Sequence, residues 1–252
     1  MNAIVQTPPP ATCPAAYRAR LATNPEEVRA AQRLRFNVFN LELNEGLSDS
    51  FVIGADVDEF DAVCDHLIVT EVATGQVVGT YRMQTGRMAA HGRGYYSAGE
   101  FDLTPFEPLR DELVELGRAC VDRAHRNLVV LGLLWKGIAD YATARGGRYL
   151  IGCSSLTSQD PAVGARLYAD LFRQHLAPAA WRTRPRPHCE CPLHELADEP
   201  VAVPKLLRTY LALGARICGA PALDREFRTI DFLTLLDIAT LSPQTRARFF
   251  GR

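Results

Sequence analysis

Residues 112–156 constrain the fold most, because they predict a strand, a helix and a second strand in direct succession. The first strand covers residues 112–121. A long helix follows over residues 127–145, where apolar residues recur at helical spacing and two glycines end the pattern. Residues 148–156 then form a second, largely apolar strand. Such a chain needs a layered structure in which helices cover a sheet.

Two strands upstream of this unit predict an antiparallel hairpin. They cover residues 66–73 and 77–85, and a tight turn at Thr74-Gly75-Gln76 joins them. A shorter strand at residues 17–23 comes before them. Taken with the strand–helix–strand unit, the hairpin predicts a mixed α/β or α+β fold, with a central sheet flanked by helices.

The first predicted helix begins after Asn24, a capping residue, and runs to about residue 41. Arg35 and Phe39 are four residues apart and therefore share one face of this helix. Its predicted core-facing stripe consists of Val28, Ala31, Leu34, Val38 and Leu41. The corresponding stripe of the long helix consists of Leu128, Leu131, Trp135, Ile138 and Ala142.

The C-terminal third predicts an elaboration of the same domain. A helix opens at Asp160-Pro161 and continues to about residue 175. Proline and arginine then become frequent, which indicates an irregular excursion and not a domain boundary. The last predicted elements are a helix at 204–213 and a strand at 228–238. We predict a disordered leader at 1–16 and a single domain at 17–252, with a core at 17–176 and an elaboration at 177–252.

The composition excludes several classes of function. The chain has 252 residues, 47% of them hydrophobic, and a net charge of -1, so it can bury a core but lacks the charge for nucleic-acid binding. The N-terminus has no basic region followed by an apolar run, and no segment approaches the roughly 20 apolar residues of a membrane helix. Seven scattered cysteines fit reduced thiols. A cytoplasmic protein is therefore expected.

A compact group of cysteines and histidines raises the alternative of a metal site. It consists of His188, Cys189, Cys191 and His194. The Cys-x-Cys spacing is tighter than the usual gap of zinc sites, and no second cysteine pair follows. We therefore expect exposed loop residues and no metal.

The segment Glu115-Leu116-Gly117-Arg118 carries the predicted chemistry. Residues three apart in a regular strand point to opposite faces, but a bulge at Gly117 would turn Glu115 and Arg118 toward one cleft. A bulge also releases backbone N–H groups that can stabilise an oxyanion. Glu115 would then be the base that deprotonates an amine while an amide forms from a thioester.

Acids of the long loop before the hairpin lie where the rim of this cleft is expected. Asp58 and Asp61 either recognise a cationic substrate or pair with Arg35, Arg82 and Arg118 to fix the site. Arginines offer planar, two-pronged contacts for the carboxylate of an amino-acid substrate. A single pair of an acid and an arginine is more often structural, and that alternative stays open for each acid.

A donor site is predicted at the start of the long helix. Arg123, Arg126 and the N–H groups of Asn127 and Leu128 would meet a phosphate at the positive end of the helix dipole. Segment 123–127 contains no glycine. The predicted docking surface for an acidic carrier protein consists of Arg123, Arg126, Arg145 and Arg148.

These motifs resemble those of the GNAT superfamily and, within it, of the ornithine-lipid type N-acyltransferases. The pattern is also similar to that of acyl-homoserine-lactone synthases. The resemblance spans roughly residues 20 to 175, over the stretches 31–39, 58–61, 64–67, 78–82, 115–118 and 133–141. The residues that carry it are Arg35, Phe39, Asp58, Asp61, Arg82, Glu115 and Arg118.

The resemblance implies a GNAT-like twisted mixed sheet and transfer of a 3-hydroxyacyl group from acyl carrier protein to the α-amine of L-ornithine, giving lyso-ornithine lipid. The donor substrate is the acyl-phosphopantetheine of the carrier, and no cofactor is implied, because the glycine-rich phosphate loop of CoA-dependent members is absent. The implied catalytic residues are Glu115, Arg118 and Asp61. The implied substrate-binding residues are Arg35, Phe39, Asp58 and Arg82.

Several alternatives stay open. The acceptor can be glycine or another amino acid, since residues 40–54 match the family pattern poorly and can line the acceptor pocket. A lactone-forming signal synthase and a non-catalytic acyl-carrier-binding module are the other two readings. A lipid-like product is compatible with peripheral membrane association, for which residues 181–186 form the candidate surface.

Overall fold

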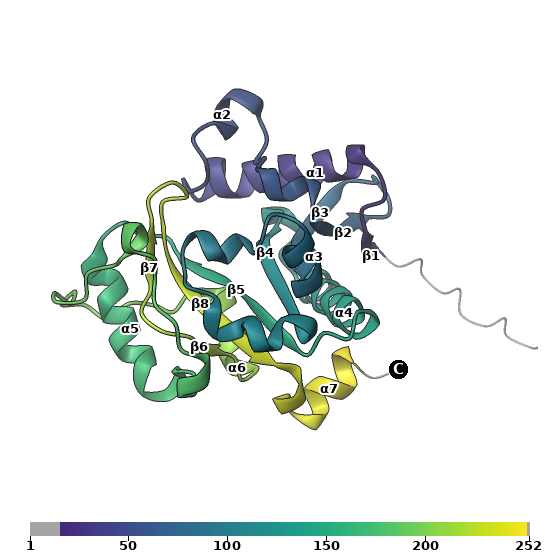
Figure 1. The fold of residues 1–252 in the computed structure, drawn as a ribbon. Coiled ribbons are helices and arrows are strands. Elements are labelled where there is room, and N and C mark those ends of the chain that lie inside the picture. Colours follow the sequence, from purple (N-terminus) through teal and green to yellow (C-terminus); the bar gives the residue numbers. More distant parts are fainter. Residues whose placement is uncertain (1–15, 251–252) are drawn as a thin grey trace, which may run out of the picture.

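The computed structural model describes residues 16–250 and contains one eight-stranded sheet in the order β1-β2-β3-β4-β5-β8-β6, with β7 paired to β8 (Figure 1). The strands are β1 (Tyr17–Leu21), β2 (Asp65–Glu71), β3 (Val77–Thr85), β4 (Leu113–Val121), β5 (Tyr149–Leu156), β6 (Arg216–Ile217), β7 (Ala222–Asp224) and β8 (Thr229–Asp237). The helices are α1 (Pro25–Phe36), α2 (Ser50–Ile53), α3 (Gly86–His91), α4 (Leu128–Ala144), α5 (Pro161–His175), α6 (Lys205–Ala212) and α7 (Pro243–Phe249). Except for Ala16, the predicted leader lies outside the described residues.

The predicted mixed α/β fold is confirmed. The strands β2 and β3 form the predicted antiparallel hairpin, and β4, α4 and β5 form the predicted strand–helix–strand unit with parallel strands. Asn24 caps α1 by accepting the N–H of Glu27 at 2.9 Å. Gly146, which follows the end of α4, has a φ of 69°, in the left-handed region that favours glycine.

Helices cover both faces of the sheet (Figure 1). On one face, α4 and α6 pack over a core that includes Val114 and Leu150. On the other face, α1 packs over Ile68, and α3 contacts β3 and β4. Because side chains alternate along a strand, Glu115 points away from the α4 side and toward the α1 and α3 side.

The C-terminal segment completes the sheet instead of forming a separate layer. The strand β8 lies between β5 and β6 and pairs with β5 over eight residue pairs, from Tyr149–Asp237 to Leu156–Ile230. The short strands β6 and β7 and the helix α7 have no counterpart in the sequence-based prediction. Each is too short to show a clear hydrophobic period.

One predicted core position in the first helix is wrong. The helix α1 ends at Phe36 and continues as a π-helix over Asn37–Glu42. A π-helical turn holds more residues than an α-helical turn, so Leu41 rotates out of the stripe and is 60% exposed. Leu34, which precedes the π-helix, and Val38, which lies near its start, are buried as predicted.

The predicted face of the long helix is also wrong at its start. Leu128 is 79% exposed and Leu131 is 42% exposed. The buried side chains of α4 are those of Val130, Leu134, Ile138, Ala139, Tyr141 and Ala142. The helix is apolar nearly all round, so its period does not define the buried face. The close approach of Gly137 to Leu67 does, since a Cβ at Gly137 would lie 2.6 Å from a Leu67 methyl carbon.

None of the helices within residues 16–250 combines the length and the hydropathy needed to cross a lipid bilayer.

Because of the π-helix, we expect Leu34 and Leu41 to contribute differently to the free energy of unfolding, although both belong to one predicted stripe. We expect Leu34→Ala to lower the free energy of unfolding by about 2–5 kcal/mol, because it leaves a cavity in the core. The matched change Leu41→Ala should alter it by less than about 0.5 kcal/mol. Urea unfolding followed by circular dichroism measures both values. Equal losses in the two variants would show that the helix continues without the π-helical turn.

Candidate active site

A bulge in β4 brings Glu115 and Arg118 to the same side of the sheet. The register between β3 and β4 shifts between Thr80 and Arg82, so β4 contains one more residue than its partner there. Arg118 lies in this bulge and has a φ of 49°. The extra residue reverses the alternation of side chains after it. The predicted bulge is therefore present, and its left-handed residue is Arg118 instead of Gly117.

The Glu115 carboxylate is held by three N–H donors and is only 4% exposed. Oε2 accepts from Gln84 Nε2 at 2.6 Å and from the Tyr96 N–H at 2.9 Å. Oε1 accepts from the Ser97 N–H at 2.8 Å. These donors fix the orientation of the carboxylate. An ionised carboxylate has about four acceptor sites. Within the described residues, one site on Oε1 therefore remains unused.

Glu115 lines a small cavity on the α1 and α3 side of the sheet. The cavity encloses about 230 Å³ of empty space. Its lining consists of Cys64, Arg82, Met83, Gln84, Tyr96, Glu115, Leu116 and Gly117. A small amine that enters this space meets the carboxylate directly.

Three arginines and three aspartates, whose side chains are at most 13% exposed, form a network beside this cavity. Its members are Arg35, Arg82, Arg118, Asp56, Asp58 and Asp61. Arg35 is fully buried and binds both carboxylate oxygens of Asp61, at 2.8 and 2.7 Å. Its Nε lies 2.8 Å from an oxygen of Asp56. The six formal charges sum to zero, as buried charges require.

Arg118 and Arg82 join this network in different ways. Arg118 contacts Asp56 at 3.1 Å and Asp58 at 3.0 Å, and its guanidinium lies 4.7 Å from the ring centre of Tyr96. Arg82 contacts both Asp58 and Asp61 through the single atom Nη1. Its other N–H groups are not used by the aspartates, and Arg82 lines the cavity.

The network keeps its aspartates ionised. Burial alone would raise the pKa of Asp61, but the hydrogen bond from Arg35 and the charges of Arg35 and Arg82 hold that pKa well below its usual range. For Asp58, burial is likewise outweighed by Arg82 and Arg118, and its pKa is lowered. Of the two roles predicted for these residues, the structure shows mutual pairing. Asp56 was missed by the sequence analysis, which considered only the Asp58-Glu59-Phe60-Asp61 motif.

Phe39 supports the network without lining the cavity. Its ring packs edge-on against Phe227, with ring centres 5.3 Å apart. The Phe227 ring in turn lies 4.4 Å from the Arg118 guanidinium, on which it stacks. Phe39 thus acts on Arg118 through another ring.

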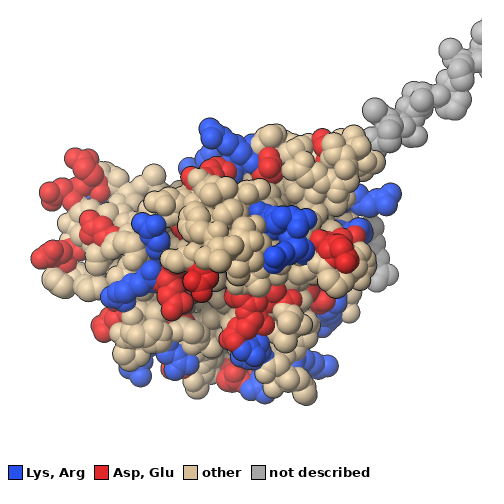
Figure 2. Space-filling model, turned by 90° about the horizontal axis from the view of Figure 1, so that it is seen from above, with Lys and Arg blue, Asp and Glu red and all other residues tan. Residues whose placement is uncertain are grey.

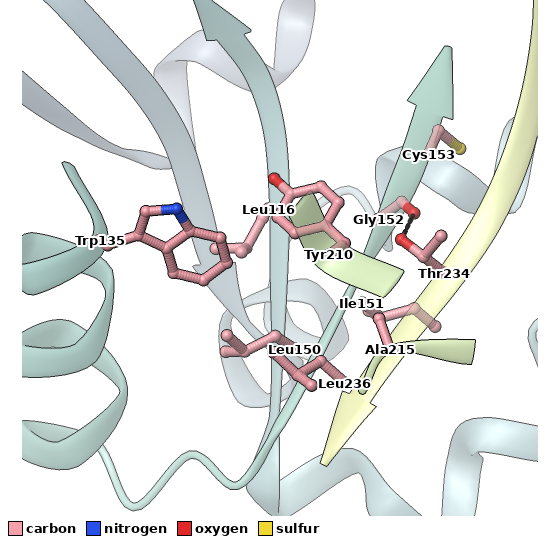
Figure 3. Close-up of a pocket in the computed structure, with 10 residues that line it drawn as sticks. All are labelled: Leu116, Trp135, Leu150, Ile151, Gly152, Cys153, Tyr210, Ala215, Thr234 and Leu236. Carbon is pink, nitrogen blue, oxygen red and sulfur yellow. Dashed lines mark hydrogen bonds between the residues drawn. The ribbon is translucent and has the colours of Figure 1, made fainter. Parts of the chain in front are cut away.

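A second cavity lies on the opposite face, where β4 and β5 separate (Figure 3). The pairing of these strands ends at Glu115–Ile151. The cavity encloses about 320 Å³ of empty space and has a mainly apolar lining. The residues that line it are Leu116, Trp135, Leu150, Ile151, Gly152, Cys153, Tyr210, Ala215, Thr234 and Leu236. Leu116 lines both cavities, so they adjoin across β4.

The residues predicted to bind the donor at the start of α4 are partly engaged elsewhere. Arg126 forms two bonds to Glu42, at 2.5 and 2.7 Å. The Asn127 side chain caps the helix by accepting two N–H groups of its first turn, each at 3.0 Å. Arg123 and Leu128 are exposed. A phosphate at this helix end would therefore meet Arg123 and the Leu128 N–H before the other predicted donors.

The surface shows no face of a single charge in the direction from which Figure 2 is drawn, since acidic and basic side chains are interspersed there. Besides Arg126, two more arginines of the predicted docking surface form ion pairs, Arg145 with Asp65 at 3.1 Å and Arg148 with Asp237 at 2.8 Å. Trp181, in the segment predicted to meet a membrane, packs edge-on against Tyr149.

The expectation that the cysteines near residue 190 are exposed is wrong, because Cys189 and Cys191 are both buried. His188 and His194 are exposed. Within residues 16–250, one group of three acidic or sulfur side chains brings its oxygen and sulfur atoms within 4.8 Å of one another. It consists of Glu100, Cys153 and Asp231.

Comparisons with known proteins agree with this architecture. Residues 34–136 match the acetyltransferase (GNAT) domain model. An acyl-homoserine-lactone synthase, LasI, has the same fold, with a TM-score of 0.52 and 11% identity over 93% of this chain and 95% of that one. FeeM, an N-acyl amino acid synthase from uncultured soil microbes, gives a TM-score of 0.53 and 13% identity over 89% of this chain and 91% of that one.

One known protein is similar to this chain in sequence and not only in fold class. The L-ornithine N(alpha)-acyltransferase of Rhodobacter capsulatus is 34% identical over 253 aligned residues, which cover 96% of this chain and 97% of that protein. Since this likeness extends over nearly the whole of both chains, the protein belongs to the L-ornithine N(alpha)-acyltransferase family of GNAT-type acyltransferases.

Proposed function

We propose that this enzyme transfers a 3-hydroxyacyl group from acyl carrier protein to the α-amine of L-ornithine, giving lyso-ornithine lipid. The name of the 34% identical relative supports ornithine as the acceptor and its α-amine as the acylated group. The observation that carries the chemistry is the Glu115 carboxylate, which lines the smaller cavity and keeps one acceptor site on Oε1 unused within the described residues. A carboxylate in this position is a suitable general base.

Each of the two cavities would bind one of the two substrates. The acyl chain suits the apolar cavity between β4 and β5, where it would bury its methylene groups against Trp135 and Leu150. The thioester would then lie at the gap near Leu116, which lines both cavities. Beyond the last β4–β5 pair at Glu115, the N–H groups of β4 that point toward β5 have no strand partner. They are the candidate donors to the oxyanion.

The acceptor would bind on the α1 and α3 side. Its α-ammonium would meet Oε1 of Glu115, and its carboxylate would meet the N–H groups of Arg82 that the aspartates do not use. Arg35 and Arg118 would hold Asp56, Asp58 and Asp61 in place and would not contact the acceptor themselves.

The reaction then proceeds in two steps. Glu115 accepts one proton from the ammonium, directly or through one water, and the neutral nitrogen attacks the thioester carbon to form a C–N bond. The carbonyl oxygen becomes negatively charged. When the C–S bond breaks, the thiolate leaves, and the second proton of the attacking nitrogen passes to it. The products are the amide and the free thiol of the carrier.

The segment before α4 favours an acyl donor bound to a carrier protein over an acyl-CoA donor. Residues 123–127 contain no glycine, and the Asn127 side chain already occupies the N–H groups that a CoA pyrophosphate would need. A carrier needs only one phosphate contact and a docking surface. The exposed Arg123 provides a cation beside the same helix end.

Purified protein mixed with 3-hydroxyacyl carrier protein and single amino acids tests the proposal. We expect release of the carrier thiol with L-ornithine, and formation of the Nα-acyl product by mass spectrometry. The same acyl group on CoA should react at least tenfold more slowly. Absence of thiol release with every amino acid would contradict the proposed function, and glycine as the best acceptor would contradict the choice of ornithine.

We expect Glu115→Gln to lower kcat by about 10²- to 10⁴-fold, the usual contribution of a general base. The amide keeps one oxygen acceptor but cannot take a proton from the amine. Affinity for the acyl carrier protein should stay within about threefold, because the apolar cavity lies on the other face of the sheet. Kinetic assays measure kcat, and a binding titration with a non-hydrolysable acyl carrier protein measures the affinity for the donor. Equal losses of turnover and donor binding would assign Glu115 a structural role.

We expect the ion network to stabilise the folded protein. We expect Arg35→Leu to lower the free energy of unfolding by about 3–5 kcal/mol, because it leaves Asp56 and Asp61 without their main partner. The matched control is Arg87→Leu, which breaks a pair with Asp111 whose side chains are 70% and 73% exposed. It should cost less than about 1 kcal/mol in urea unfolding. Similar values for both variants would mean that the buried network contributes no more than a surface pair.

A further inference from the structure

A pair of buried carboxylates lies on the same face of the sheet as Glu115. Glu100 follows the 3₁₀ turn Tyr96–Gly99, and Asp231 lies on β8. Both side chains are more than nine-tenths buried. With both groups ionised, Oε2 of Glu100 and Oδ1 of Asp231 accept no hydrogen bond from the described residues, and the two carboxyls lie within hydrogen-bond reach of each other. Buried oxygens without partners are rare and costly, so this pair needs an explanation.

The surroundings of this pair are acidic. Cys153 contributes its thiol, which lies 3.7 Å from Oε1 of Glu100. Asp224 and the buried Glu45 lie near enough for their charges to act on Asp231. Within residues 16–250, neither Glu100 nor Asp231 forms an ion pair with a lysine, arginine or histidine. The arginines nearby are balanced by the aspartates of the ion network.

The ionised pair is unfavourable in the empty site. Burial, together with the charges of Asp231 and Asp224, raises the pKa of Glu100 well above its usual range. Burial likewise raises the pKa of Asp231 to about 6, and Asp224 adds to this effect. A cation that entered between the two carboxylates would remove this penalty.

The pair is well placed for the far end of an acceptor. Glu115 accepts the N–H groups at the start of the Tyr96–Gly99 turn, and Glu100 follows its end. A 3₁₀-helix rises about 2 Å per residue, so three residues from Ser97 to Glu100 span roughly 6 Å. The two nitrogens of an extended ornithine are also roughly 6 Å apart, given standard bond lengths. Cys153 bridges the two places, since its thiol also lies 3.6 Å from the Ser97 hydroxyl.

We propose that Glu100 and Asp231 bind the side-chain ammonium of a basic amino-acid acceptor and thereby determine which amino acid is acylated. This assignment rests on the proposed function, in which the α-amine of the acceptor lies at Glu115. An ammonium has three N–H donors, which can satisfy both unpartnered oxygens. The acidic pair thus selects for a chain that carries a cation and against an apolar chain, which would leave both oxygens unpaired.

A metal ion is the competing occupant, and the thiol disfavours it. Burial and the charges of Glu100 and Asp231 raise the pKa of Cys153 well above its ordinary value, so a metal that bound the sulfur would have to displace the thiol proton. Metals bind the thiolate and not the thiol. Two carboxylates alone are a poor set for zinc, whereas they suit an ammonium.

The matched substrates L-ornithine and L-norvaline test the proposal, because norvaline has the same carbon chain without the terminal amine. We expect wild-type kcat/KM to favour ornithine by at least 100-fold. Glu100→Gln and Asp231→Asn should each raise KM for ornithine by about 10- to 100-fold, as expected for loss of a charged hydrogen bond. For norvaline, kcat/KM should stay the same or rise in both variants, because a neutral amide costs less than a carboxylate when it lies beside an apolar chain. Glu195→Gln, at an exposed acid, is the control and should change neither.

Thermal unfolding without acyl donor provides a second measurement that does not depend on catalysis. Ornithine, but not norvaline, should raise the unfolding temperature of the wild type, and the Glu100→Gln variant should lose this response. The folded state raises the pKa of Glu100, so ionised Glu100 lowers stability as the pH rises. At pH 8 the ligand-free Glu100→Gln variant should therefore be at least as stable as the wild type. A purely structural glutamate would give a less stable variant.

The outcomes separate the two proposals. Ornithine turnover with an unchanged ornithine-to-norvaline ratio in both variants would overturn the ammonium site and leave the proposed function intact. Loss of the ornithine shift without any turnover in the wild type would support the site and contradict the proposed function. A shift of the wild type by Zn²⁺ or Mg²⁺ alone that is absent in Glu100→Gln would identify a metal site and overturn the proposal.

Discussion

The contact between Arg35 and Asp61 holds the parts of this site together. Arg35 belongs to α1, Asp61 to the turn before β2, and Arg82, which binds the same carboxylate, to β3. A buried guanidinium is stable only if carboxylates surround it, and buried carboxylates only if guanidinia do. The helix, the long loop and the strands are thus fixed relative to one another by charge. The apolar clusters around them could slide more easily, since hydrophobic contacts are not directional.

This arrangement separates support from chemistry. The aspartates and arginines satisfy one another, while Glu115 is held by an amide side chain and two backbone N–H groups. Glu115 is thus oriented by neutral N–H donors, and within the described residues no arginine forms an ion pair with it. Arg82, which lines the same cavity as Glu115, is bound to Asp58 and Asp61 instead.

The sequence contained most of the fold and the main residues of the site, because long elements have clear periods and distinct caps. It could not locate the π-helix that exposes Leu41, since π-helical turns have no strong sequence signal. The bulge was predictable as a feature from Gly117, but its position at Arg118 depends on pairing with β3. The same dependence on contacts between distant segments explains why the sequence analysis missed four other residues, Tyr96, Ser97, Glu100 and Asp231. They come from a short turn and a distant strand, and only the sheet brings them beside Glu115.

The pairing of β4 with β5 ends early, and this bears on the order in which the products would leave the enzyme. The two cavities lie on opposite faces of the sheet and adjoin at Leu116. In the proposed reaction the new amide would join a chain on one side to an amino acid on the other, so the product passes through the sheet. A molecule held in this way could not leave while the proposed carrier covered the cavity. The proposed reaction would therefore release the carrier before the lipid, and the gap between the two strands would set this order.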